Sequence, residues 1–454
     1  MKLYEKEQQV LQMLEEHGWE AWFVGGCVRD ALLGKSCDDI DITTNAAPCE
    51  VTDVFGAENI IETGLAHGTV TVKPQMTEVT TYRTEGKYTD RRHPDHVTFV
   101  RSLREDLKRR DFTINAIAMD YRGNLKDPFG GQEDLKNGII RAVGNPLKRF
   151  DEDPLRILRA LRFASVLRFS IEENTAEALL KQRELLRCVS AERIFKEFCK
   201  TLLGGDAAKI LRDFFPVWCV VIPELESMNG FMQKNPHHDF DVLEHTLRSV
   251  EYAGKLAAEN GAAEKERLNL VMTMLFHDIG KPEVYTEDEN GIGHFYRHAS
   301  VSGAICVRIL QRLKADGDTI RRVSMLVERH GIEWKEDRSF LKRRLNRFGM
   351  EDCRMLLNVR TADLSGQRER CEEGSLQHWK SRLCRIEETM DEIINEEECF
   401  SRSNLRINGS DLMRDGMDAG PEVGKVLNQL LEMVIDEKVP NEFEPLLEKS
   451  RQIR

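Results

Sequence analysis

The sequence predicts an α+β protein in which a mixed α/β head is followed by an all-α remainder. Two observations lead to this prediction. Strand-like runs recur through residues 1–145, beside one helical pattern at the N-terminus. After Pro146 the apolar residues recur at helical spacing with arginines interleaved, and the pattern stays helical downstream. The 454 residues also exceed one ordinary domain, since a domain averages about 150 residues.

The elements of the head are expected at short apolar runs. In the N-terminal helical pattern, Val10, Leu11 and Leu14 are apolar residues at helical spacing. The segment between Arg83 and His96 is polar and lacks periodicity, which is typical of a mobile loop. The expected strands cover residues 21–26, 39–44, 68–72, 78–83, 96–100 and 116–124.

The composition limits the partners and the location of the chain. Because the formal charge is -12, a nucleic-acid partner would have to bind local basic clusters rather than the chain as a whole. The 11 cysteines form no C-x-x-C pair and follow no secretory leader, so reduced thiols and a cytoplasmic location are expected. No stretch approaches about 18 uninterrupted apolar residues, so no membrane partner is expected. No obligate protein partner is inferred either.

Two acidic residues lie in the apolar run DIDITT. Asp39 and Asp41 alternate with two isoleucines, so both carboxylates should project from one face of a strand while the isoleucines point into the core. Such carboxylates can share two Mg²⁺ ions about 3.5–4 Å apart, which activate an attacking hydroxyl and hold triphosphate oxygens. On its own, a D-x-D pattern is more often a solvated strand edge.

The residues around the acid pair favour the metal hypothesis. Upstream, the pair Gly25-Gly26 would let the backbone approach a phosphate closely, and Arg29 would add a fixed cation for the same anion. Downstream, Glu78 is a candidate third carboxylate, although a structural role for it is equally open.

The stretch RRDFTINAIA adds further candidates for nucleotide binding. Arg110 could present a cation to a phosphate, while Asp111 or Asn115 contacts a sugar hydroxyl. The alternative is the N-terminus of a helix with solvated arginines.

A helix is predicted over residues 151–164, with polar side chains on one face. Arg156 and Arg159 share that face, with Asp153 at its margin. Arg162 has rotated away from it. A carboxylate only accepts hydrogen bonds and a guanidinium only donates them, so Asp153 and Arg156 could pair with the amino group and ring nitrogen of cytosine or adenine and reject uracil and guanine. The alternative is an ordinary amphipathic helix with i,i+4 ion pairs.

Taken in order, these motifs resemble one enzyme family. G-G-x-V-R-D … D-x-D, then R-R-D-F-T, then E-D-x-x-R-x-x-R is similar to the class II CCA-adding tRNA nucleotidyltransferases. They belong to the polymerase-β-type nucleotidyltransferase superfamily and are related to bacterial poly(A) polymerases. The resemblance implies a polymerase-β-like nucleotidyltransferase head over 1–145 and a helical neck with nucleotide-selecting and RNA-binding helices over 146–228. It implies Asp39 and Asp41 as catalytic ligands of Mg²⁺, and nucleotide contacts at Gly26, Arg29, Arg110, Asp153, Arg156, Arg159 and Arg162.

The resemblance also implies a reaction. Such an enzyme adds CCA to the 3′ end of tRNA without a nucleic-acid template, uses CTP and ATP, and releases pyrophosphate. A poly(A) polymerase is the nearest competitor, ranked lower because those enzymes often carry a strongly basic extension and this chain is acidic. Relatives restricted to CC addition lack part of the loop between Arg83 and His96, which is present here.

A second set of motifs lies further along the chain. The order H … HD … D, with the stretch HDIGK, resembles the HD phosphohydrolase domain, here over residues 229–371. Its implied chemistry is hydrolysis of phosphoesters by metal-activated water, as a phosphatase or 2′,3′-cyclic phosphodiesterase with a second divalent metal. The implied metal ligands are His245, His277, Asp278 and Asp363, with His298 and His330 as additional ligands or substrate contacts.

Two alternatives concern this second part of the chain. The HD domain could be degenerate and only help to hold RNA. Alternatively, the chain could be mainly a phosphohydrolase whose inactive head serves as an RNA-binding module. Residues 372–454 contain G-x-D-L and G-P-x-V-G, which resemble the family's helical tRNA-binding tail.

Overall fold

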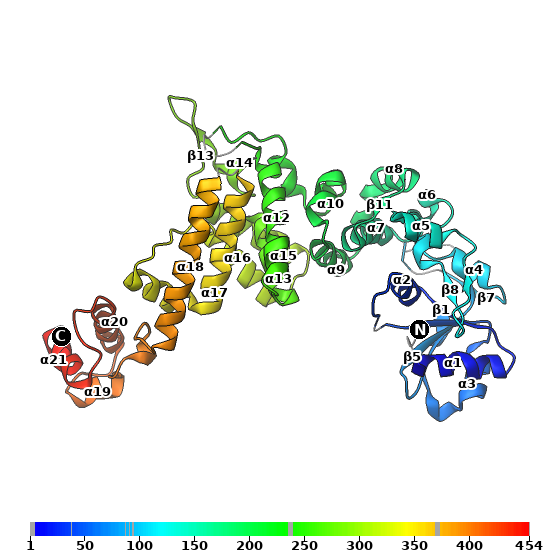
Figure 1. The fold of residues 1–454 in the computed structure, drawn as a ribbon, viewed down its shortest axis with the longest axis horizontal. Helices are drawn as coiled ribbons and strands as arrows, with labels where there is room; N and C mark the ends of the chain where they lie inside the picture. Colours follow the sequence, from blue (N-terminus) through cyan, green and yellow to red (C-terminus); the bar gives the residue numbers. More distant parts are fainter. Residues whose placement is uncertain are drawn as a thin grey trace. The chain divides into compact units, whose positions relative to one another are not determined.

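The computed structural model describes residues 5–37, 39–86, 88–89, 91–92, 95–234, 239–367 and 373–453 (Figure 1). The chain forms two compact units: residues 1–226 with 311–315, and residues 227–310 with 316–454. The expected division into head, neck, HD and tail domains is finer than this and stays a prediction, and its boundary between residues 371 and 372 lies outside the described residues. None of the helices in the described ranges combines the length and the apolar composition needed to cross a bilayer.

A mixed seven-stranded sheet with the order β3-β4-β5-β2-β1-β8-β9 organises the head. β2 and β5 run parallel and place Asp41 opposite Glu78, whereas the other neighbouring strands are antiparallel. The two acidic residues therefore occupy the same level of adjacent strands. The strands are β1 (Ala21–Val24), β2 (Asp41–Thr44), β3 (Ile60–Gly64), β4 (Thr69–Val72), β5 (Thr77–Thr81), β8 (Ala118–Met119) and β9 (Leu125–Lys126).

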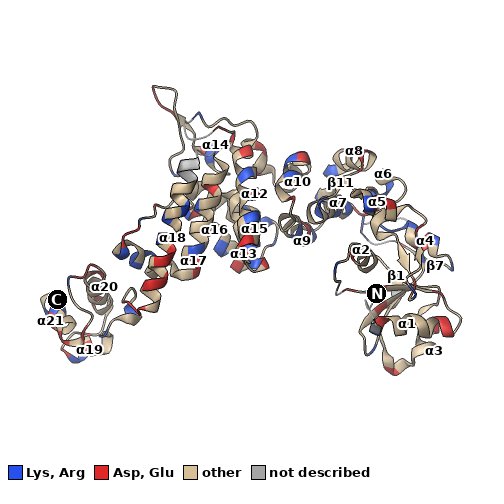
Figure 2. Cartoon of the chain, in the orientation of Figure 1, with Lys and Arg blue, Asp and Glu red and all other residues tan. Residues whose placement is uncertain are grey.

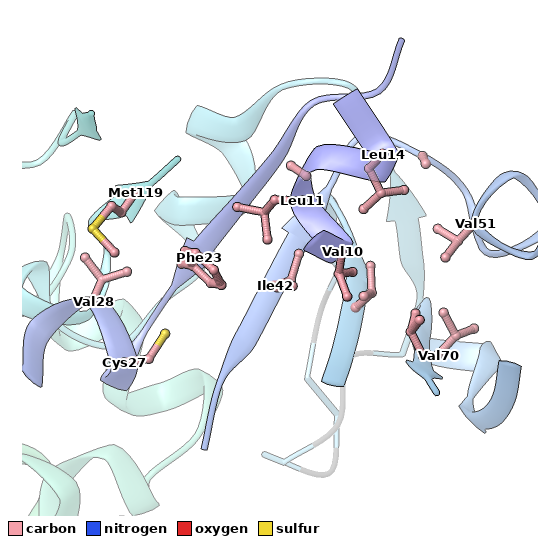
Figure 3. Packing of buried hydrophobic residues seen from close by; sticks show 14 of the residues in the cluster. Val10, Leu11, Leu14, Phe23, Cys27, Val28, Ile42, Val51, Val70 and Met119 are labelled. Carbon is pink, nitrogen blue, oxygen red and sulfur yellow. The ribbon is translucent and has the colours of Figure 1, made fainter. Parts of the chain in front are cut away.

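The N-terminal helix packs its apolar face on this sheet (Figure 3). As its helical spacing predicted, Val10, Leu11 and Leu14 are at most 1% exposed. They share one hydrophobic cluster with Phe23 of β1 and Ile42 of β2. The helices of the head are α1 (Glu5–Glu16), α2 (Gly26–Leu32), α3 (Pro48–Phe55), α4 (Leu103–Lys108) and α5 (Gly131–Asn137).

Several strands of the head lie outside the strands expected from the sequence. They are β3, β9, the short strand at residues 139–140 and, beyond its first residue, β6 (Arg83–Glu85), which pairs antiparallel with β7 (Val97–Phe99). The interpretation of the stretch between Arg83 and His96 as a loop is therefore wrong for Thr84 and Glu85. The sequence of β6 is the polar RTE, which has no apolar pattern because the strand is held by hydrogen bonds to β7.

The predicted single helix over residues 151–164 is wrong. The chain forms two helices that break at Asp153, whose φ of -140° is extended, and Pro154. Proline has no N–H to donate and disfavours the helical conformation in the residue before it. The helices and strands of this region are α6 (Pro146–Glu152), α7 (Leu155–Leu167), α8 (Glu173–Gln182), α9 (Ala191–Leu202), α10 (Ala207–Asp213) and α11 (Phe215–Val221), with the short parallel strands β10 (Ile139–Ile140) and β11 (Ser170–Ile171).

Within α7 the prediction of one buried apolar face and one accessible polar face is confirmed. Ile157, Leu158, Leu161 and Ala164 are fully buried, at 0% exposure. The arginines of the same helix stay partly accessible, and the blue of Lys and Arg marks α7 in Figure 2.

The second unit is almost entirely helical. α12 packs against α13 and α17, and α13 is buried along its second half. In the described part of the chain after residue 146, the all-α expectation fails for two-residue strands: β11 in the neck region, and the pair β12 (Thr286–Glu287) and β13 (Gly293–His294). The helices are α12 (Val242–Glu259), α13 (Glu264–Phe276), α14 (Lys281–Val284), α15 (His298–Arg312), α16 (Gly317–Arg329), α17 (Arg338–Gly366), α18 (Glu373–Asn395), α19 (Gly409–Arg414), α20 (Pro421–Ile435) and α21 (Phe443–Ile453).

We expect Gly366→Ala to destabilise the second unit. A Cβ at Gly366 would lie 2.1 Å from Oγ of Ser249 and 2.8 Å from the carbonyl oxygen of His245, so α17 and α12 would have to separate. Such overpacking costs about 1–3 kcal/mol of unfolding free energy, measurable by urea denaturation. Gly254→Ala is the matched control, because its Cβ would meet nothing within 4 Å and alanine favours the helix. Equal stability of both variants and the wild type would contradict the close contact between α17 and α12 at Gly366.

Candidate functional site

The acid pair lies at the start of β2. Asp41 is the first residue of the strand and is half-buried, whereas Asp39 lies two residues before the strand and is exposed. The expectation that both residues belong to one strand is therefore wrong by two residues. The packing of the isoleucines is as expected, since Ile42 is 1% exposed and Ile40 packs partly buried against the same core.

Electrostatics at Asp41 fit a bound cation. Burial raises the pKa of the Asp41 carboxyl, Arg110 lowers it, and the nearby carboxylates of Asp39 and Glu78 raise it again. Three acidic groups that repel one another suit a hard divalent cation with oxygen ligands. Asp39 and Asp41, with Glu78 beside them, therefore fit Mg²⁺.

Two glycines bring the backbone close to this acid. Gly25 has a φ of 80°, which favours glycine, and a Cβ there would lie 3.1 Å from Nη1 of Arg110 and 3.5 Å from Oδ2 of Asp41. Gly26, the first residue of α2, would place a Cβ 3.6 Å from Nη2 of Arg29. The glycine pair thus leaves room for the two arginines and the acid to converge.

A chain of hydrogen bonds joins α2 to α7 through Asp111. Arg29 donates from Nη1 to Oδ1 of Asn115 at 2.8 Å, and Asn115 donates from Nδ2 to Oδ1 of Asp111 at 3.0 Å. Arg159 donates from Nε to Oδ2 of Asp111 at 2.8 Å. Burial alone would raise the pKa of Asp111, but Arg159 and Asn115 hold it well below its usual range. Asp111 and Asn115 therefore position Arg29 of α2 on one side and Arg159 of α7 on the other.

Three arginines gather around one aromatic ring. The guanidinium carbons of Arg29, Arg159 and Arg162 lie 5.0, 5.4 and 4.2 Å from the ring centroid of Phe163. The electron-rich ring offsets part of the repulsion between these cations. Such a cluster suits an anion with several charges, such as a triphosphate.

The two residues expected to read the base are adjacent, but their side chains have separate partners. The backbone N–H of Arg156 donates to the carbonyl of Asp153 at 3.0 Å. Nη1 of Arg156 donates to Oε2 of Glu152 at 2.8 Å, whereas Oδ2 of Asp153 accepts from Nη2 of Arg193 at 2.8 Å. The structure thus places Arg193, which lies in α9, beside the expected reading residues.

The predicted HD residues converge on Asp278 in the second unit. Nε2 of His245 lies 3.2 Å from Oδ2 of Asp278, and Nε2 of His277 lies 3.1 Å from the same oxygen. Oδ1 of Asp363 lies 3.3 Å from Nε2 of His245 and 3.7 Å from Nε2 of His277. All four side chains are at least nine-tenths buried, so the predicted ligands form one enclosed cluster.

The other oxygen of Asp278 faces two further histidines. Nε2 of His298 and of His330 lie 3.5 and 3.8 Å from Oδ1 of Asp278. Two groups with metal-ligand spacing, His245 with His277 and Asp278, and Asp278 with His298 and His330, therefore share one carboxylate. Imidazole and carboxylate groups in this arrangement fit borderline divalent cations.

Protonation of this cluster is uneven. Burial alone would lower the pKa of His245, but the carboxylates of Asp278 and Asp363 raise it to about 9. Burial lowers the pKa of His330 to about 4. The neutral imidazole of His330 is the form that can bind a metal.

Three family models match parts of the chain. A Poly A polymerase head domain matches residues 21–141, an RNA- and SrmB-binding region of polymerase A matches 168–215, and a tRNA nucleotidyltransferase domain 2 matches 285–449. The first match covers the acid pair, the glycines and Asp111.

The CCA-adding enzyme of Ligilactobacillus salivarius is 33% identical to this chain over 99% of the chain and 96% of its own length. The chain belongs to the family of CCA-adding enzymes. A crystal structure of the Bacillus stearothermophilus CCA-adding enzyme in complex with CTP matches the fold with a TM-score of 0.68 at 30% identity, covering 100% of this chain and 98% of that one.

A more similar relative matches a shorter region. The CCA-adding enzyme of Lactobacillus helveticus is 49% identical, and the alignment covers 54% of this chain and 62% of that enzyme. In such alignments the chain spans less than two thirds of the relative's length. The expected α+β fold and the resemblance to class II CCA-adding enzymes are confirmed, whereas the HD domain stays a prediction.

Sequence reasoning missed several residues that lie beside the two candidate sites. Arg193 pairs with Asp153 across 40 positions, and no local motif could have joined them. In the second unit, Nζ of Lys281 lies 2.7 Å from Oδ2 of Asp278 and donates to Oε1 of Gln233 at 2.7 Å. Lys281 is the lysine of HDIGK, so the motif itself was a signal that could have found it. It follows Asp278 by three residues and begins α14.

We expect Asp111→Asn to destabilise the first unit by about 1–3 kcal/mol at pH 7, because Arg159 loses a charged partner while Asn115 keeps its hydrogen bond. The folded pKa of Asp111 is depressed, so the ion pair contributes fully above about pH 4 and less as the pH falls further. The difference in unfolding free energy between variant and wild type, measured by urea titration, should therefore shrink at pH 3.5. A difference that is independent of pH would contradict the ion pair.

Proposed function

We propose that this chain completes the CCA sequence at the 3′ end of tRNA, using CTP and ATP without a nucleic-acid template and releasing pyrophosphate. The observation that carries the proposal is that Arg110 lies beside Asp41 at Gly25, while Asn115 and Asp111 join Arg29 to Arg159, in a member of the CCA-adding family. Relatives of this family have been solved with CTP, with ATP and with tRNA, which supports the same partners here. A tRNA substrate also agrees with the expected cytoplasmic location.

In this proposal the 3′ hydroxyl of tRNA attacks the α-phosphate of the bound nucleotide. Asp39 and Asp41 would hold Mg²⁺, which neutralises phosphate charge and activates the hydroxyl when bound. Arg29, Arg159 and Arg162 bind the triphosphate through charge-assisted hydrogen bonds and orient its leaving group. Most of the rate enhancement would come from positioning and charge neutralisation.

The base is selected by protein side chains in this proposal. The carboxylate of Asp153 accepts from the amino group of cytosine or adenine, and the guanidinium of Arg156 donates to the neighbouring ring nitrogen. Uracil and guanine present a carbonyl and a ring N–H there and would leave buried groups unpaired, at about 1–3 kcal/mol each. That difference corresponds to a preference of about 5- to 160-fold for each unpaired group.

The RNA would be bound by local clusters of basic residues, since the chain is acidic overall. The arginines of α7 form one such cluster (Figure 2). A second basic run, at residues 342–344, is occupied internally: Lys342 pairs with Glu398, and Arg343 pairs with Glu432 at 2.7 Å. We therefore assign no RNA contact to that run.

Primer extension tests this function against its alternatives. A tRNA that lacks its 3′ CCA, incubated with Mg²⁺ and each labelled nucleotide, should gain two CMP and then one AMP, with little UMP or GMP. Repeated AMP addition would instead indicate a poly(A) polymerase, and a product that stops after CC would indicate partial addition. No incorporation at all would contradict nucleotidyl transfer.

We further propose that the second unit hydrolyses phosphoesters, as a phosphatase or 2′,3′-cyclic phosphodiesterase. The observation that favours this second function is the pair of ligand groups that share Asp278. His245, His277 and Asp363 would hold a divalent metal, which activates water for attack on phosphorus when bound. Lys281, whose amine is buried beside Asp278, supplies a positive charge at the same site.

The two functions should be separable by mutation. Asp41→Ala removes a Mg²⁺ ligand of the first unit and should reduce CMP addition by at least 1,000-fold while leaving hydrolysis of 2′,3′-cyclic AMP unchanged. His277→Ala should have the reverse effect, because its imidazole lies in the other unit. Each activity is measured on both variants in the same buffer. Equal losses in both variants would contradict two separate sites.

A further inference from the structure

The pair formed by Asp153 and Arg193 joins the break between α6 and α7 to helix α9, next to the nucleotide-selecting residues. Oδ2 of Asp153 accepts from Nη2 of Arg193 at 2.8 Å, and Oδ1 accepts from the backbone N–H of Leu155 at 3.1 Å. The side chains of Asp153 and Arg193 are 17% and 24% exposed. The pair is therefore sheltered, yet still accessible to a ligand.

These two anchors fix the plane of the carboxylate. Each carboxylate oxygen can accept two hydrogen bonds, so the pairs to Leu155 and Arg193 leave one acceptor position on each oxygen of Asp153. With an anchor at both oxygens, rotation of the group about its last torsion is prevented. The amino group of a base would then approach the Asp153 carboxylate along one fixed direction.

Arg156 cannot take over this anchoring role in the same arrangement. Its guanidinium donates to Oε2 of Glu152 at 2.8 Å and to the carbonyl oxygens of Arg149 and Arg109 at 3.2 Å each. Two of these acceptors lie in α6 and the third, Arg109, directly follows α4. They hold the guanidinium of Arg156 against these two helices. The side chain that orients Asp153 is Arg193.

Helix α9 is a rigid support for this arginine. It packs along α7, and Ile194 and Phe198 are buried at 8% and 0% exposure. One turn after Arg193, Glu197 lies 3.2 Å from Nε of Arg162. The same helix therefore holds one residue expected to read the base and one expected to bind the triphosphate.

We propose that Arg193 is a positioning residue that determines base selectivity by fixing the acceptor direction of Asp153. The proposal rests on the CCA addition proposed above. Without Arg193 the carboxylate can rotate, accept from the ring N–H of uracil as well as from the amino group of cytosine, and so lose its discrimination. Removing a hydrogen bond between charged groups is expected to lower the CTP:UTP ratio of kcat/KM by about tenfold or more.

The test measures single CMP and UMP additions to a tRNA that lacks CCA. Arg193→Ala and Arg193→Gln should raise KM for CTP, lower the CTP:UTP ratio and leave KM for tRNA unchanged. Arg193→Lys keeps the charge and should keep part of the selectivity. Arg321→Ala is the matched control, since Arg321 is 71% exposed, pairs with Asp318 and lies in α16 of the second unit, and it should behave as the wild type.

A double-mutant cycle separates a role through Asp153 from a general structural role. If Arg193 acts through Asp153, then Asp153→Ala and the double variant with Arg193→Ala should have the same CTP:UTP ratio. Multiplied effects in the double variant would overturn the proposal. So would an unchanged ratio in whichever of Arg193→Ala and Arg193→Gln retains the wild-type melting temperature.

The activity of the wild-type protein distinguishes a failure of the proposed CCA addition from a failure of the proposed role of Arg193. If the wild-type protein adds no CMP, the proposed CCA addition has failed. If it adds CMP with selectivity and the Arg193 variants keep that selectivity, only the role of Arg193 has failed.

Discussion

The buried carboxylate of Asp111 is the constraint on which the first site depends. It lies between Asn115, which holds Arg29 of α2, and Arg159 of α7. A buried charge is tolerated only where its partners are held in place, because the loss of one partner leaves the other charge unpaired. Asp111 therefore fixes the arginines of the helical region relative to the glycines and the acid pair of the head.

The two sites neutralise their buried charges in different ways. Asp111 is neutralised by Arg159, so this part of the first site is complete with protein groups alone. Asp278 is surrounded by histidines, and Nζ of Lys281 lies 2.7 Å from its Oδ2. The second cluster thus has the composition of a metal site, whereas the arginines of the first have that of an anion site.

Local patterns in the sequence predicted those features that depend on local geometry. The alternation around Asp41 predicted a strand with Ile42 in the core, and helical spacing predicted the buried face of α7. The order of the HD residues predicted side chains that converge from several helices. Features that depend on distant partners were missed, as β6 requires β7 and Arg193 requires Asp153. The break at Pro154 was readable from the sequence and was overlooked, because the apolar spacing continues across it.

Binding of the four nucleoside triphosphates in the absence of RNA tests the central claim most directly, because only protein groups can then select the base. Titration calorimetry with Mg²⁺ present should give tighter dissociation constants for CTP and ATP than for UTP and GTP, by about tenfold or more. Equal affinities for all four nucleotides would contradict selection by Asp153 and its neighbours, and would assign that role to the RNA.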